Sequence, residues 1–165
     1  MNQTHLHLLI THLPIFGSIL GAVVLTHGLW TKSNHTKIAA YIVFIISAIG
    51  AGIAYLTGEA AEETVEDIQG ITKKVIEEHE EFAIIALVSL IILGLASIVG
   101  LFLTLRKARL AKTISWVILL ISFISFGLVA WTGYMGGQIR HTEINSNTTI
   151  QVQGGESNEN NKSMK

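Results

Sequence analysis

Four long apolar runs, separated by polar stretches, dominate the chain. They cover residues 8–30, 38–56, 82–105 and 113–135. Each run is close to the roughly 20 residues that a helix needs to cross about 30 Å of hydrocarbon. The pattern predicts an all-α protein whose residues 1–142 form a four-transmembrane-helix up-down bundle, with an external connection at residues 58–81. Residues 143–165 are rich in Asn, Ser, Gly, Glu and Gln, and predict a disordered polar tail.

The charged residues are distributed unevenly over the two ends of this predicted bundle. The turns at residues 31–37 and 106–112 hold six of the eleven Lys and Arg residues and no acidic residue. All twelve Asp and Glu residues lie on the opposite side. Short loops rich in Lys and Arg stay in the cytoplasm. We therefore expect a multi-pass protein of the cytoplasmic (inner) membrane with both termini on the external, periplasmic side.

Composition excludes several classes of protein. Of 165 residues, 50% are hydrophobic and 14% are charged, and the net charge is −1. This balance is not that of a protein that binds nucleic acid, and membrane lipid is the expected surrounding. The chain has no cysteine, so it has no disulfide, no thiolate metal site, no iron–sulfur cluster and no covalently attached c-type haem.

Histidines are the candidate chemical groups, and most of them gather at the predicted external end. Of the seven in the chain, five lie there: His5, His7, His12, His79 and His141. The first and third helices are diagonal in a simple bundle. His12 and His79 have similar predicted depths, so they could face each other across the interior.

Three interpretations of these histidines stay open. Two opposed imidazoles suit an iron porphyrin with two axial histidines. A bare zinc or copper ion wants three or four ligands, which His12, His79, His141 and a nearby Glu could supply. Histidines at a membrane interface also simply bond to headgroups, water or backbone. Gly133, Gly136 and Gly137, near His141 in the sequence, are candidates for the close approach of a macrocycle or a helix.

Three stretches of the chain carry a family resemblance. They are His-Leu-Leu-Ile-Thr-His-Leu-Pro-Ile-Phe-Gly at residues 7–17, Thr-Gly-Glu-Ala-Ala at 57–61 followed by Glu-His-Glu at 78–80, and Thr-Gly-Tyr-Met-Gly-Gly-Gln-Ile-Arg-His at 132–141. The chain resembles a bacterial family of predicted four-helix membrane proteins of unknown function. Its members begin with a His-Pro…His-Phe-Pro-like motif and end with a Gly-Gly…His-like motif.

The resemblance implies b-type haem binding, with the family's histidines falling on His7, His12, His79 and His141. The chain departs from the first motif at Leu8, which replaces a proline, and at Thr11. We therefore expect a membrane-bound b-type haem protein that carries electrons at the external face.

In this hypothesis the chain holds one or two haem b groups. His12 and His79 are the axial ligands, and Arg140 is a partner for a propionate. His141, with His7 or His5, is a second ligand set or approaches the haem propionates or a second haem. Bis-histidine iron leaves no open position, so an electron carrier or redox subunit is favoured over a stand-alone enzyme. It has no catalytic residues of its own, since the chemistry belongs to the cofactor. Quinol or an external cytochrome is the expected redox partner, and the glycine-rich helices are compatible with a homodimer.

Two alternatives remain at this point. One is a zinc- or copper-binding or transport protein that uses His12, His79, His141 and the acidic helical face of Glu59, Glu62, Glu63 and Glu66. The other is a structural membrane subunit without a cofactor.

Overall fold

The computed structural model describes the backbone of residues 9–62 and 73–162, and the side chains of residues 9–58 and 78–137. The described residues form helices and short turns. The four long helices are α2 (His12–Trp30), α3 (Asn34–Glu62), α4 (Lys73–Leu105) and α5 (Ala111–Lys162). The predicted all-α class is confirmed.

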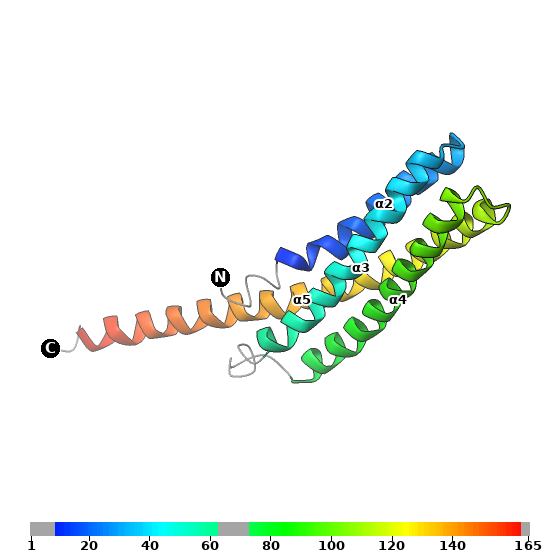
Figure 1. The fold of residues 1–165 in the computed structure, drawn as a ribbon. Coiled ribbons are helices and arrows are strands. Elements are labelled where there is room, and N and C mark those ends of the chain that lie inside the picture. Colours follow the sequence, from blue (N-terminus) through cyan, green and yellow to red (C-terminus); the bar gives the residue numbers. More distant parts are fainter. Residues whose placement is uncertain (1–8, 63–72, 163–165) are drawn as a thin grey trace.

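The helices form a slender bundle that runs along one direction (Figure 1). Extensive contacts join α2 to α3, α3 to α4, α4 to α5 and α5 back to α2, so that α2 and α4 lie diagonally. Segments of all four helices are long and apolar enough to cross a membrane: His12–Trp30, Asn34–Gly58, Glu78–Leu105 and Ala111–Gly137. The prediction of four candidate spans is confirmed, and the bundle is that of a multi-pass membrane protein.

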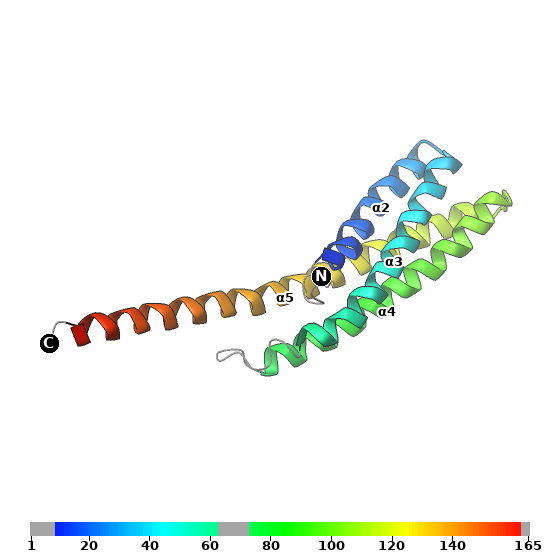
Figure 2. The same ribbon diagram turned by 60° about the vertical axis from the view of Figure 1, so that its left-hand side comes forward.

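The two short turns, α2–α3 and α4–α5, lie at the same end of the bundle in both views (Figures 1 and 2). Each preceding helix ends in a Schellman motif, which satisfies its last carbonyl groups. In each motif a lysine takes the left-handed conformation, Lys32 with φ 53° and Lys107 with φ 52°. The bonds that close the motifs run from Ser33 N–H to Gly28 C=O (3.0 Å) and from Ala108 N–H to Leu103 C=O (3.0 Å).

The interior is packed with small and apolar side chains, and the helices approach one another at glycines. A Cβ atom at Gly94 of α4 would lie 2.7 Å from the Cβ of Ala48 in α3, and one at Gly50 would lie 2.7 Å from Leu13 Cδ2. Real Cβ contacts are never this short, so the missing side chains set the helix spacing. The largest fully buried side chains are Tyr41, Phe44, Leu25, Leu90, Leu93 and Ile118.

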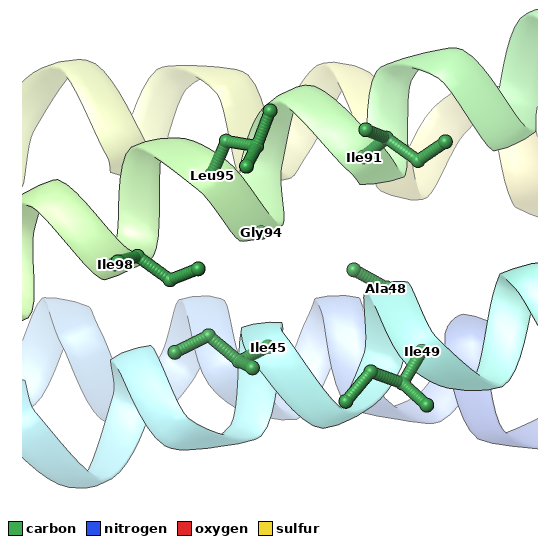
Figure 3. A pocket seen from close by; sticks show the side chains of 7 residues that line it. All are labelled: Ile45, Ala48, Ile49, Ile91, Gly94, Leu95 and Ile98. Atoms are coloured by element: carbon green, nitrogen blue, oxygen red, sulfur yellow. The ribbon is translucent and has the colours of Figure 1, made fainter.

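The outer faces are also apolar, as a bilayer requires. Between α3 and α4 this surface holds a groove of about 290 Å³, shown in Figure 3. It is lined by Ile45, Ala48, Ile49, Ile91, Gly94, Leu95 and Ile98. No side chain of this lining is polar, so the groove offers a cofactor no ligand and suits a hydrocarbon chain.

The helices extend beyond the predicted spans at the end opposite the short turns. Helix α3 continues to Glu62 and α4 begins at Lys73, so the connection predicted at residues 58–81 is helical at both of its ends. The backbone of α5 continues to Lys162, whereas the sequence predicts a disordered tail from residue 143. This part of α5 projects away from the bundle (Figures 1 and 2). A helix that has already formed adds residues without a nucleation penalty, even where propensity is poor.

Candidate functional site

His79 lies within the hydrophilic first part of α4 and is partly buried. Its imidazole packs against Gly136 of α5, where a Cβ atom would lie 3.1 Å from Cε1. The Nδ1 atom of the ring is shielded from solvent. The absent side chain of Gly136 therefore makes the room that the imidazole fills. Gly136 was among the glycines that the sequence singled out for a close approach, and the structure places it against a candidate ligand.

Contacts between α4 and α5 hold this arrangement in register. The hydroxyl of Thr132 is shared between the Leu128 carbonyl of its own helix, at 2.9 Å, and the carbonyl of Phe82, at 3.3 Å and one turn from His79. The Phe82 ring packs edge-on against Trp131, with 6.5 Å between centroids, and Trp131 in turn contacts Tyr134 at 5.7 Å. Aromatic side chains with a polar tip favour the membrane–water interface. These rings are consistent with His79 lying close to that interface.

His12 is the first residue of α2, and it is exposed. Its ring stacks on Phe16, one turn along the helix, with a centroid distance of 6.2 Å and an interplanar angle of 16°. The sequence allowed His12 to face the bundle interior, and the structure differs. Leu13 packs against Gly50 of α3, and neighbouring helical residues point about 100° apart. With Leu13 directed toward Gly50, His12 points away from this contact between α2 and α3.

Of the candidate ligands, only His12 and His79 lie among the residues whose side chains the structure describes. The same part of the chain contains no group of three His, Cys, Asp or Glu residues that could hold a metal ion. His7 lies outside the described residues, and Arg140 and His141 lie on α5 where only the backbone is described.

Sequence reasoning missed the buried hydroxyl groups of the interior. Six serines are fully buried: Ser18, Ser47, Ser97, Ser115, Ser122 and Ser125. The Tyr41 hydroxyl and Ser115 Oγ lie 2.8 Å apart and form a hydrogen bond across the bundle. Ser125 Oγ donates to the Ser89 carbonyl at 3.2 Å, which links α5 to α4. The sequence of α5 does indicate a face with hydroxyl groups, because Ser115 and Ser122 are seven residues apart and share one side of the helix.

Comparison with known proteins adds no relative. No family model, curated protein or solved structure matches the chain.

Proposed function

We propose that this protein is a membrane-bound b-type haem protein that carries electrons at the external face of the cytoplasmic membrane. The observation that carries the proposal is the packing of the His79 imidazole against Gly136. A planar ligand ring needs a fixed orientation, and a flat macrocycle needs neighbours without side chains. The family resemblance of the histidine motifs supports the same function.

The orientation in the membrane is part of the proposal. The two short turns carry Lys and Arg without any Asp or Glu, which favours the cytoplasmic side for that end. The bundle is then up-down, with both termini, His12 and His79 at the external end. Electron exchange takes place at that end, with quinol in the membrane or with an external cytochrome.

The packing of the bundle limits where a haem fits. Its middle is filled by fully buried side chains such as Phe44, Leu93 and Ile118, which leave no space for a macrocycle. The external end fits better, because His79 is partly buried there and His12 is exposed. With His79 as one ligand and His12 as the other, the haem lies at the rim of the bundle rather than in its interior. When bound, the haem supplies one-electron transfer.

The remaining candidate residues have secondary roles in this proposal. His141 and His7 form a further ligand set or serve a second haem, and Arg140 pairs with a propionate. Two axial imidazoles leave iron with no open position. This is the reason to propose an electron carrier or redox subunit rather than an enzyme.

The test is a visible spectrum of detergent-purified protein made with ample haem supply, oxidised and then reduced with dithionite. We expect the sharp reduced α-band of a low-spin b-type haem. His79→Ala and His12→Ala should each abolish it. His27→Ala is the matched control, because His27 is another exposed histidine of α2, located near the opposite end of that helix. It should leave the band unchanged.

Other outcomes would replace the proposal. A colourless protein with stoichiometric zinc or copper would favour a metal-binding protein that uses His12, His79 and His141. A colourless and metal-free protein, with membrane levels unaffected by any histidine substitution, would favour a structural subunit.

A further inference from the structure

The apolar groove between α3 and α4 lies on the outer surface of the bundle (Figure 3). Within it, Gly94 of α4 faces Ala48 of α3, and larger side chains such as Ile49 and Ile98 surround this contact. Its volume of about 290 Å³ is far more than the ~30 Å³ that one water molecule takes up. The lining offers water no hydrogen-bond partner, so a hydrocarbon group is the suitable occupant.

A line of side chains on α4 leads from this groove to the end of the helix. Ile91, Leu95 and Ile98 belong to the lining. They are followed by Phe102 and Arg106 at the spacing of one helical face. Phe102 is exposed, and the Arg106 N–H donates to the Phe102 carbonyl at 3.0 Å, which continues the helical bonding pattern. The apolar face that lines the groove therefore continues to Phe102 and ends at Arg106.

A cation–π contact holds the guanidinium group of Arg106 at the end of this face. Its Cζ atom lies 5.2 Å from the centroid of the Phe102 ring. Arg106 directly follows the candidate span Glu78–Leu105 and is exposed, so a group at the membrane surface can reach it. Arginine presents its N–H donors in a planar fork that matches the oxygen atoms of a phosphate group. The side chain thus offers an anion site where the span ends.

The distances along α4 match those within a phospholipid of one leaflet. Ile98 and Ile91 precede Arg106 by eight and fifteen residues, which correspond to about 12 and 22 Å along a helix. The phosphate groups of a bilayer lie about 20 Å from its midplane, and hydrocarbon fills about 15 Å of that depth. An acyl chain whose phosphate binds Arg106 therefore reaches the groove with its deeper part.

The charge at this end of the bundle favours an anionic lipid. The two short turns lie at the same end (Figures 1 and 2) and hold six Lys and Arg residues and no acidic residue. We propose that the α3–α4 groove and Arg106 form a binding site for an anionic phospholipid, with an acyl chain in the groove and the phosphate at the guanidinium group. Arg106 lies at the other end of α4 from His79, so a test of this site does not depend on the proposed haem.

The experiment measures binding of phosphatidylglycerol and of zwitterionic phosphatidylcholine to the full-length protein in detergent by native mass spectrometry. We expect the wild type to bind phosphatidylglycerol about tenfold more tightly than phosphatidylcholine. Arg106→Gln should abolish this preference, because the charge-assisted bond to the phosphate is lost. Arg109→Gln is the matched control, since Arg109 is an exposed arginine of the same turn, and it should keep the preference.

A second substitution tests the groove itself. Ile98→Trp adds ring atoms that fill part of the groove, and it should weaken binding of both lipids by about threefold, because contacts with the acyl chain are lost. Ile92→Trp is its matched control. Ile92 is an exposed residue of the same helix and does not line the groove, so this variant should bind both lipids like the wild type.

Three results would overturn the proposal. One is an unchanged preference for phosphatidylglycerol in Arg106→Gln, and another is equal binding of the lipids by Ile98→Trp and Ile92→Trp. The third is a dimer in the same mass spectra that Ile98→Trp dissociates, because the groove would then belong to a contact with a second copy. Should Ile98→Trp fail to fold, as judged by circular dichroism, Ile45→Trp on the α3 side of the groove decides together with Arg106→Gln.

Discussion

At the scale of single residues, the contact between His79 and Gly136 joins local packing to the proposed chemistry. The imidazole takes the space that a side chain at Gly136 would fill. A Cβ atom at its neighbour Gly137 would meet none of the described residues within 4 Å. The two glycines therefore differ in what a side chain would meet, although they are adjacent in the sequence. Substitutions at the two glycines can therefore distinguish a specific role of Gly136 in placing His79 from a general preference for small residues in this part of α5.

We expect Gly136→Val to displace the His79 ring and to lower the haem content of the purified protein by about tenfold, the effect of losing about 1.4 kcal/mol of binding free energy. Gly137→Val should leave the haem content unchanged, because its side chain enters open space. The measurement is the reduced-minus-oxidised absorbance per mole of protein. Equal haem content in the two variants would mean that Gly136 does not position a ligand.

The left-handed lysines of the two turns are a second feature at this scale. A residue with a Cβ atom costs roughly 1 kcal/mol in this conformation relative to glycine. Lys32 and Lys107 occupy it at φ 53° and 52°. The free energy of unfolding alone therefore favours glycine at both positions. We attribute the occurrence of lysine at these positions to its positive charge.

Replacing either lysine with glycine should raise the free energy of unfolding by about 0.5–1 kcal/mol, since the strain is relieved. Arg109→Gly is the control, because Arg109 lies in the same turn and does not have a positive φ; it should give no gain. The measurement is unfolding by SDS in mixed micelles. Unchanged or lower stability in both lysine variants would show that the lysine side chains hold the turns together.

At the scale of the helices, spacing is set where two backbones approach closely. Gly94 faces Ala48 across the α3–α4 contact, whereas a Cβ atom at Gly52 of α3 meets nothing within 4 Å. Gly94→Val should lower the free energy of unfolding by about 1–3 kcal/mol, because the extra atoms push the helices apart. Gly52→Ala should raise it by up to about 1 kcal/mol through better helix propensity. Thermal unfolding in detergent tests both, and an equal effect of the two substitutions would contradict the packing argument.

The helices themselves could be predicted from the sequence, because each apolar run has about the length that a helix needs to cross the hydrocarbon core of a bilayer. The rotation of each helix about its axis could not. In a soluble bundle, polar residues mark the outer face, but here both the lipid-facing and the interior faces are apolar. His12 turns outward because Leu13 packs at Gly50, a contact that no periodicity in the run reveals. The sequence did single out Gly136 for a close approach, but it related this glycine to His141, whereas the structure places it against His79.

At the scale of the whole molecule, the distal part of α5 projects away from the bundle (Figures 1 and 2). Helix α5 extends far beyond the other helices (Figure 2), and its span ends at Gly137. A chain that stops after Thr142 should therefore unfold with a free energy within about 0.5 kcal/mol of the full-length protein, as expected for changes away from packed features. SDS unfolding of both forms is the measurement. A clearly less stable truncated chain would mean that residues 143–165 contact the bundle or a second copy.

The charged residues are distributed unevenly along the molecule, and this distribution underlies the proposed orientation in the membrane. The two short turns, at residues 31–37 and 106–112, hold six Lys and Arg residues and no acidic ones, and the rest of the sequence holds every Asp and Glu. Moving the basic end across the membrane would oppose the positive-inside tendency, which depends on Lys and Arg in short loops. A single orientation should therefore dominate. It would place the two short turns at the cytoplasmic side and His79 at the external side.

The natural absence of cysteine makes this orientation directly measurable. Single cysteines can be introduced by Leu110→Cys or Asn34→Cys in the basic turns and by Asn145→Cys beyond the last span. Leu110 and Asn34 are exposed, so a thiol at either position is open to reagent from its own side of the membrane. We expect a membrane-impermeant maleimide to label only Asn145→Cys in cells whose outer layer admits the reagent and whose cytoplasmic membrane is intact. All three cysteine variants should be labelled after detergent is added. Labelling of the turn positions in intact cells would show that the short turns face outward, opposite to the proposed orientation. Electron exchange at His79 would then have to occur with cytoplasmic partners.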